Sequence, residues 1–333
     1  MRRSPTSPVP RSADGRPGWA RFLLGRIAGA ALVLAVLSVL VFAATAVLPG
    51  DAAGGLAGPD ATEAERDRIR ADLGLDRPAV QRYLIWAGGL LRGDLGTAWV
   101  GGRPVGELLV DRLPDSALLA GLALLVIAPL GVLLGLLAGL RAGRTADRAV
   151  STGALLAVGV PEFLTAALLV AVFGTWLQLF PRVSLVPLGG SGLDTPEVLV
   201  LPVLTLSVVG LATATRMIRS SAAEVAASPY IEAAQLGGVR GARLALRHVL
   251  PNAAGPAVQV LAVVVGGLVG GSVVVETVFG YPGVGQELAQ AVARRDVPVV
   301  QGLTLVLAAV ALAALLAGDV VRRLLDPLGQ GSG

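Results

Sequence analysis

Few side chains in this sequence could carry out chemistry. The chain has one His, no Cys and, among its basic residues, no Lys. Without Cys there is no disulfide, thiolate nucleophile or thiolate metal ligand, and one His cannot build a zinc site with two or more imidazoles. A P-loop also needs a Lys to reach the nucleotide phosphates. We therefore expect no metal site, no other cofactor and no conventional P-loop ATPase.

One polar stretch, residues 228–256, interrupts the apolar sequence and holds the single histidine. Ser228 and Pro229 are typical of the start of a helix, where Ser caps and Pro is tolerated. Glu232 near that start favours the positive end of the helix dipole. Gly237-Gly238 are typical of a helix end. The pattern predicts a short helix between these signals.

A second helical stretch is predicted from Val239 to Leu250, ending at Pro251-Asn252. Its spacing of i, i+3 and i+7 places three arginines on one face: Arg240, Arg243 and Arg247. Two short helices with a glycine elbow would form a rigid surface element. For a generic Arg-bearing helix, an ordinary solvated loop is the alternative.

Two carboxylates fall within apolar stretches, Glu162 in GVPEFL and Glu276 in VVVETVF. A carboxylate inside a bilayer is costly and by default marks a functional site. Glu162 could line a translocation path and meet a cationic group, or it could pair with an Arg or hydrogen-bond within the helix bundle. Glu276 and the following Tyr281-Pro282-Gly283 could form a pore mouth, although termination of a helix by Pro-Gly explains the latter equally well.

The remaining charges near the apolar stretches suggest no function. Asp319 is expected at an interface, paired with Arg322 or Arg323 at i+3 or i+4. Arg294, Arg295 and Asp296 are expected in a solvated outer loop.

The elements that must position these residues are membrane helices. The composition is 54% hydrophobic and 15% charged, whereas soluble domains carry ~25% charged residues. Apolar runs near the ~20 residues needed to cross a bilayer predict an all-α polytopic membrane protein with about six spans. The spans are expected at residues 22–48, 118–140, 150–179, 198–217, 258–279 and 299–316.

Arginines cluster before the first span, between the second and third, between the fourth and fifth, and after the sixth. These alternate connections lie on one side, which the positive-inside rule makes cytoplasmic, so both termini are expected inside. The basic charge suits such loops, and nothing favours a nucleic-acid partner. The predicted organisation is a tail at 1–20, a membrane domain at 21–325 and a tail at 326–333. The membrane domain includes an external loop at 49–115 and a cytoplasmic segment at 218–256.

The external loop carries helical signals of its own. Thr62 and Glu65 form a capping box for a helix ending near Gly74, and Pro78 suits the first position of another. Interfacial helices lying on the membrane are the simplest interpretation, and the second would present one apolar face: Val80, Tyr83, Leu84, Ala87 and Leu91. Close helix packing is expected at glycines spaced four apart, namely Gly131, Gly135, Gly139, Gly266 and Gly270.

The polar stretch 228–256 resembles the EAA motif of ATP-binding-cassette importer permeases, E-A-A-x-x-x-G, nine residues, then I-x-L-P. Six residues match the motif: Glu232, Ala233, Ala234, Gly238, Leu250 and Pro251. His248 departs from it, because it stands where the family has Ile. In that family this segment docks on the ATPase, so the resemblance implies an ATPase-coupling role for the six residues.

The resemblance extends over most of the chain, from about residue 21 to 327. LPGDAA, LGLDRPAVQRYLIWAGGLLRGDLGTAW, GRPVGELLVDRLPDSALL and GGSVVVETVFGYPGVGQELAQ look like the dipeptide, oligopeptide and nickel importer permeases with a long loop after the first span. Glu162 departs from the small polar residue that is more common there. The family implies a bacterial plasma membrane protein that pairs with a second permease in membrane lipid. Two ATPase subunits and an external solute-binding protein complete the importer.

Two other classes compete with an importer permease. A secondary transporter or channel would work without ATP and leaves the EAA-like segment unexplained. A membrane-embedded enzyme is poorly supported, because no HExxH motif is present and no Ser/His/Asp set converges in one predicted layer. The substrate stays open among dipeptides, longer peptides, nickel and glutathione-like molecules.

Overall fold

The computed structural model describes residues 19–47, 61–187 and 190–325. In these ranges all named elements are helical, and an isolated β-bridge joins Thr97 to Pro104, which confirms the all-α prediction. Most of the predicted tails and the start of the predicted external loop lie outside the described residues.

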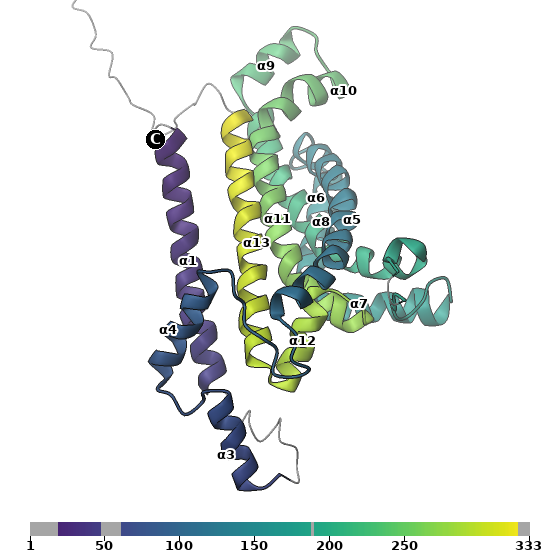
Figure 1. Ribbon diagram of the computed structural model, residues 1–333. Helices are drawn as coiled ribbons and strands as arrows, with labels where there is room; N and C mark the ends of the chain where they lie inside the picture. Colours follow the sequence, from purple (N-terminus) through teal and green to yellow (C-terminus); the bar gives the residue numbers. More distant parts are fainter. Residues whose placement is uncertain (1–18, 48–60, 188–189, 326–333) are drawn as a thin grey trace, which may run out of the picture.

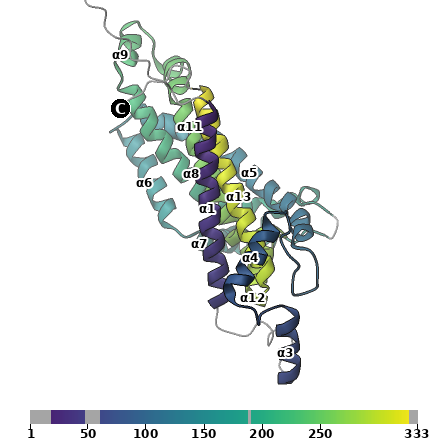
Figure 2. The same cartoon turned by 60° about the vertical axis from the view of Figure 1, so that its left-hand side comes forward.

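Five helices are long and apolar enough to cross a membrane, and a bent pair makes a sixth candidate. The five are α1 (Trp19–Val47), α5 (Val105–Gly139), α8 (Glu197–Ala226), α11 (Leu250–Phe279) and α13 (Val297–Leu325). They run side by side in Figure 1, with α1 at the left-hand edge, and Figure 2 shows α1 in front, running along α13. The prediction of about six spans is confirmed.

The shorter helices lie mainly at the two ends of this bundle (Figure 1). At one end are α9 (Pro229–Leu236) and α10 (Gly241–Leu244), which continues into the π-helical turn Ala245–Val249. At the other are α3 (Glu63–Asp72), α4 (Ala79–Leu90) and α12 (Val284–Arg294). We call these the α9 end and the α12 end. The start of α1 and the last turns of α13 both lie at the α9 end (Figure 1).

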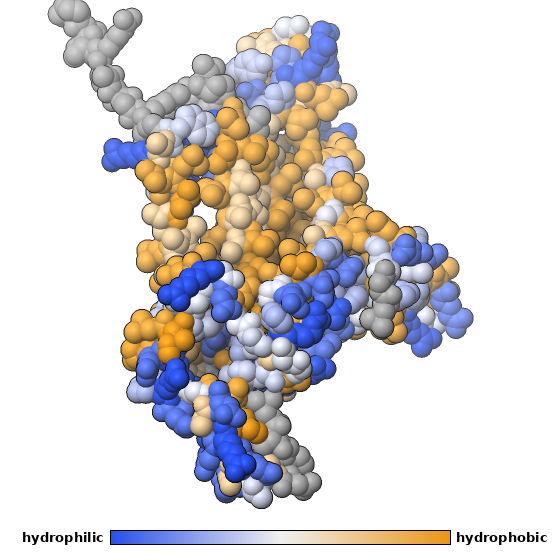
Figure 3. Space-filling model, in the orientation of Figure 1, coloured by the Kyte–Doolittle hydropathy of each residue, from blue (hydrophilic) through white to orange (hydrophobic). Residues whose placement is uncertain are grey.

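A broad apolar surface covers the bundle between two more polar ends, as Figure 3 shows. Helix α1 is the most exposed span, with only 6% of its most apolar window buried. Exposed leucines and valines in a long helix are typical of a surface solvated by lipid chains.

The core is formed where α5, α8 and α11 pack together around Leu119, Ile127, Leu206, Ile218 and Leu268. Glycines of α5 bring its backbone close to α8. A Cβ added at Gly131, Gly135 or Gly139 would lie 2.9, 2.8 or 2.7 Å from the Cβ of Ala214, Ile218 or Ala222. The predicted close packing is confirmed for these three glycines. For Gly266 and Gly270 it is wrong within the described chain, because a Cβ there would meet nothing within 4 Å.

The third predicted span, 150–179, is not one straight helix. It consists of α6 (Thr145–Gly159) and α7 (Glu162–Leu169), which continues into the π-helical turn Val170–Trp176, and the two parts are bent by 100°. The residue before a proline is driven out of the helical region, and Val160, before Pro161, has ψ 121°. Glu162 therefore begins a new helix after a bend instead of lying in the middle of a span.

Two helices start well before the predicted spans. Helix α5 begins at Val105, so its first turns occupy the end of the predicted loop 49–115. Pro251 does not end the second helical stretch: α11 runs from Leu250 through Pro251 and Pro256 to Phe279. Pro251 stands in the first turn of α11, where the missing N–H costs little.

Helix α3 forms as predicted, and α4 begins at Ala79, one residue after the predicted start at Pro78, which stands at its N-cap. Thr62 and Glu65 make the reciprocal capping box, in which the Thr62 backbone N–H donates to the Glu65 carboxylate over 2.8 Å. That hydrogen bond, with one from the Thr62 hydroxyl, lowers the pKa of Glu65. Helix α4 packs on α1, where Tyr83 contacts Ser38 and Phe42.

Candidate functional site

Helix α9 is fixed to the end of the bundle by one buried side chain. Ile231 is fully buried in a cluster with Leu136 of α5, Ala222 of α8, and Leu244 and Val249 of the following turn. Pro229 is the first helical residue and Ser228 precedes it, as predicted. The helix stops at Gly237, also as predicted. Because its anchor joins three elements, α9 is expected to move together with the ends of α5 and α8.

The elbow after α9 depends on two glycines. Gly238 has φ +87° and Gly241 has φ +62°, a left-handed conformation that side chains with a Cβ adopt only with strain. Gly238 is predicted from its place beside Gly237, whereas the sequence pattern gives no sign of Gly241. As a result, Arg240 lies in extended backbone at the cap of α10 and does not share a helix with Arg243 and Arg247. The predicted face of three arginines is wrong.

The outer surface of α9 is exposed and carries unusual side chains for the polar end of a protein. Glu232 and Ala233 are exposed, and no ion pair or hydrogen bond of the Glu232 carboxylate occurs within the described ranges. Tyr230, Leu236 and Leu246 are also exposed, Leu236 by 85%. A group of exposed apolar side chains is typical of a protein-docking surface.

His248 has a local structural contact. Its Nδ1 lies 2.8 Å from the Tyr230 hydroxyl, and the two rings are 5.8 Å apart. The contact ties the turn before α11 to the first turn of α9. Of the other motif residues, Ala234 and Leu250 are partly buried against the Ile231 cluster, while Pro251 is exposed at the start of α11.

Glu162 lies against the backbone of α11. A Cβ at Gly271 would be 2.5 Å from Glu162 Oε1, so a larger residue there would displace this carboxylate. The side chain is partly exposed, and the described residues give it neither a hydrogen bond nor an ion pair. The alternative that it pairs with an Arg or hydrogen-bonds within the bundle is thus not realised in the described part of the chain.

Glu276 is fully buried and hydrogen-bonded at both oxygens. The Ser116 hydroxyl donates to Oε1 over 2.7 Å. The backbone N–H groups of Gly285 and Gln286 donate to Oε2 over 2.7 and 3.2 Å. The carboxylate therefore joins α5, α11 and the start of α12.

The chain turns between α11 and α12 beside Glu276. Helix α11 ends at Phe279, and the following residue Gly280 caps it with φ +65°, before the Pro-Gly pair is reached. Tyr281 is fully buried, and its hydroxyl donates to the Asp115 carbonyl over 3.2 Å. Burial raises the pKa of that hydroxyl above its ordinary value.

Two acidic residues that were expected to be solvated or paired with a near neighbour instead have partners far away in the sequence. Asp296 is only 4% exposed, and it accepts hydrogen bonds from the N–H groups of Trp99 and Val100 over 3.1 and 2.9 Å. The expectation that it lies in a solvated loop is wrong. Asp319 pairs with Arg26 of α1 over 3.1 Å and not with Arg322 or Arg323. None of these three partners is close in sequence, so local spacing could not reveal them.

Another buried carboxylate, Asp147, was not singled out from the sequence. It accepts hydrogen bonds from Arg219 Nε and Nη2 over 2.8 and 2.7 Å, which clamps α6 to α8. Among the described residues, no three His, Asp or Glu side chains converge closely enough to hold a metal ion.

Comparison with known families identifies the architecture. A family model described as the inner membrane component of a binding-protein-dependent transport system matches residues 131–328. A second model, for the N-terminal region of such membrane components, matches residues 19–120.

Several curated relatives are similar along nearly their whole length. A putative peptide transport system permease protein of Brucella abortus (strain 2308) is 35% identical over 305 residues, which are 92% of this chain and 97% of that protein. A probable peptide ABC transporter permease protein of Sinorhizobium fredii is 31% identical, with 92% and 98% covered. The oligopeptide transport system permease protein AppB of Bacillus subtilis is 29% identical, with the same coverage. The chain therefore belongs to the inner membrane components of binding-protein-dependent transport systems, the permease subunits of ABC importers.

Proposed function

We propose that this chain forms one half of the translocation pore of a bacterial plasma membrane importer for peptides, and that α9 couples the pore to an ATPase subunit. The peptide substrate is supported by the names of the similar permeases. In this proposal the α9 end faces the cytoplasm and the α12 end faces the solute-binding protein.

Membership in the family makes the chain a transport component and not an enzyme, as predicted, with ATP hydrolysis in separate subunits. An ATPase and a solute-binding protein are accordingly its partners. We further propose the stoichiometry that the sequence resemblance implies, which is a second, related permease and two ATPase subunits.

The coupling role is supported by the contrast between the buried inner side and the exposed outer side of α9. Its inner side is anchored by Ile231, while its outer side presents Glu232 with exposed apolar residues. Transmission of ATPase movements requires a stiff element that moves together with the spans. A short helix fixed to three elements and exposed on its other side meets that requirement.

A face of α11 supports the pairing with a second permease. Val263, Gly267, Gly270, Val274 and Val278 are exposed and follow helical spacing. Exposed small residues on a membrane helix permit close approach of another helix. Glu162 is packed against the same helix at Gly271, so we propose that the pore passes near this face, with Glu162 beside it.

The coupling role predicts that Glu232→Arg and Gly238→Val each abolish uptake. The first reverses a charge on the exposed docking surface, and the second puts a branched side chain at φ +87°. In proteoliposomes holding the complete importer, peptide-stimulated ATP hydrolysis should fall by about tenfold or more, which corresponds to about 1.4 kcal/mol of lost coupling.

The matched control is Glu197→Arg, an exposed carboxylate at the opposite end of α8, which should leave uptake unchanged. All variants should insert into the membrane to similar levels. Normal uptake by both the Glu232 and the Gly238 variants would rule out the coupling role of α9.

A further inference from the structure

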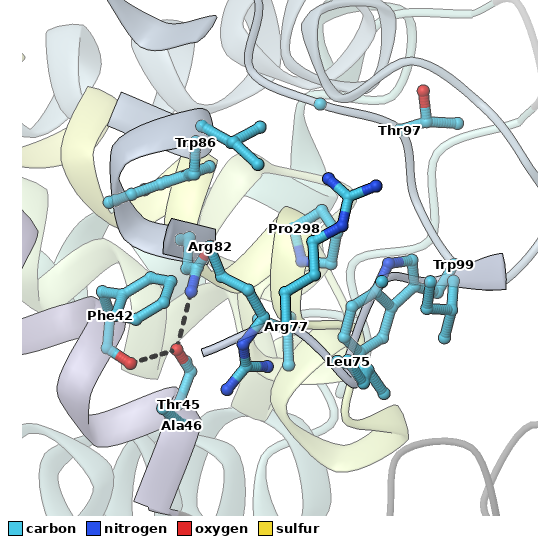
Figure 4. Close-up of a pocket in the computed structure, with 16 residues that line it drawn as sticks. Phe42, Thr45, Ala46, Leu75, Arg77, Arg82, Trp86, Thr97, Trp99 and Pro298 are labelled. Atoms are coloured by element: carbon cyan, nitrogen blue, oxygen red, sulfur yellow. Dashed lines mark hydrogen bonds between the residues drawn. The ribbon is translucent and has the colours of Figure 1, made fainter. Parts of the chain in front are cut away.

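A cavity of about 520 Å³ opens at the α12 end of the molecule, at some distance from α9. It lies between the last turns of α1, helix α4, the connection 96–99 and the start of α13. Figure 4 shows two arginine side chains, Arg77 and Arg82, extending between Phe42 and Trp86 on one side and Trp99 on the other. This volume is in the range of small-ligand sites.

The cavity is positively charged. Among the described residues that line it are Arg77 and Arg82 but no Asp or Glu. Neither arginine forms an ion pair with a residue that the structure describes. Arg82 also lies over the Phe42 ring, 6.0 Å from its centroid, which holds its guanidinium at the cavity wall.

Two buried donors in the lining have no acceptor within the described ranges. They are Nε of Arg82 and Nε1 of Trp86, on consecutive turns of α4. Buried donors are almost always hydrogen-bonded in proteins, and each exception calls for an explanation. Together with two guanidinium groups, they indicate that the cavity accepts a group rich in oxygen and negative charge, such as a phosphate.

The surroundings of the cavity are apolar. Helix α4 turns an apolar face away from the protein, with Val80 72%, Leu84 63% and Leu91 91% exposed. In Figure 3 this region lies at the border between the apolar surface of the bundle and the polar α12 end. In a membrane protein that border falls at the level of the lipid headgroups.

We propose that this cavity binds the phosphate of an anionic phospholipid through Arg77, Arg82 and the indole N–H of Trp86, with the acyl chains against the apolar face of α4. A free inorganic phosphate could use the same donors but would leave that face unused. The site is separate from α9 and from Glu162, so lipid binding is independent of the proposed pore and coupling roles.

The test uses the purified importer in detergent and phosphatidylglycerol brominated in its acyl chains, which quenches nearby tryptophan fluorescence. Trp86 and Trp99 line the cavity, so quenching should saturate with phosphatidylglycerol. Brominated phosphatidylcholine should quench weakly at the same concentrations, and inorganic phosphate should not relieve the quenching.

The variant Arg77→Gln/Arg82→Gln should weaken phosphatidylglycerol binding by about tenfold or more, since it removes two charge-assisted interactions. Arg92→Gln is the matched control, because Arg92 is exposed just after α4 and outside the cavity. The single variant Arg77→Gln alters only an exposed side chain, so it should fold normally and still weaken binding.

Three results would overturn the proposal. Equal affinity of the double variant and Arg92→Gln would show that the two arginines do not hold the lipid. Equal quenching by phosphatidylcholine would show that the cavity does not recognise the anionic headgroup. Displacement by inorganic phosphate at comparable concentrations would identify a site for free anions instead of lipid.

Discussion

At the scale of single residues, buried carboxylates join elements that are far apart in the sequence. Asp147 joins α6 to α8, Asp296 joins the start of α13 to the connection before α5, and Glu276 joins α5, α11 and α12. A buried carboxylate is costly unless it is paired or hydrogen-bonded, so each of these contacts specifies one arrangement of the helices.

The clamp at Asp147 gives a prediction at this scale. Besides Arg219, the carboxylate accepts hydrogen bonds from Gly143 N and Ser151 Oγ over 2.8 and 3.1 Å. Asp147→Asn removes the charge and leaves the Arg219 guanidinium without its counter-ion. We expect a lower thermal unfolding temperature of the purified protein and faster hydrogen exchange at residues 143–151.

A double-mutant cycle with Arg219→Gln checks the mechanism, because the two effects should overlap instead of adding. Asp72→Asn, at an exposed carboxylate of α3, is the neutral control. Strictly additive effects of Asp147→Asn and Arg219→Gln would show that the ion pair does not stabilise the fold.

Local contacts could be predicted from the sequence, whereas distant partners could not. The capping box of Thr62 and Glu65 depends on residues three apart, and it forms as predicted. Asp319 had equally suitable neighbours at i+3 and i+4, yet it pairs with Arg26 on the opposite part of the chain. Helix packing decided that choice, and packing cannot be read from spacing along one helix.

At the scale of elements, the glycine row of α5 sets the distance to α8. A Cβ at Gly135 would lie 2.8 Å from Ile218 Cβ and 3.1 Å from the backbone nitrogen of Arg219. Backbone cannot move aside as a flexible side chain can, so a larger residue must separate the helices.

We therefore expect Gly135→Leu to destabilise the protein by about 1–3 kcal/mol, the usual cost of overpacking. The control on the same helix is Gly121→Leu, because a Cβ there meets nothing within 4 Å and little loss is expected. Thermal unfolding in a fixed detergent compares the two. Equal losses would attribute the effect to helix propensity and not to contact with α8.

Most helices could be predicted from apolar length, but proline positions could not be interpreted without the fold. Pro161 coincides with a bend of 100° between α6 and α7, whereas Pro251 and Pro256 lie within the continuous helix α11. Pro251 lies in the first turn of α11, where its missing N–H costs no helical hydrogen bond, whereas Pro256 lies inside the helix. The position of a proline within a helix depends on where that helix begins. Here Val249, which is buried in the Ile231 cluster, fixes the turn that precedes α11.

At the scale of the whole molecule, the exposed face of α11 that contains Gly267 and Gly270 packs against no other described part of this chain. Because the chain contains no Cys, a single introduced cysteine can be cross-linked without background. Gly270→Cys should form a disulfide with a cysteine placed on the matching helix of the second permease, because Gly270 is exposed and no atom lies near its Cβ position.

Leu268→Cys is the matched control, since Leu268 lies on the same helix but is buried within this chain at 4% exposure. It should give no cross-link. Cross-linking is read as a shift to the mass of two permeases on a non-reducing gel. If no cysteine along the corresponding helix of the second permease captures Gly270→Cys, the two chains do not meet at this face.

The continuity of α11 makes it a lever. Its 30 residues span about 45 Å, from the anchor of α9 at one end to the carboxylate of Glu276 at the other. A tilt of about 5° at the α9 end would displace the far end by about 4 Å, roughly the width of a side chain. Gly271, which lies closer to the far end and against Glu162 of α7, would travel most of that distance. A small rocking of the first turns would therefore be enlarged at the opposite side of the membrane without any helix having to unwind.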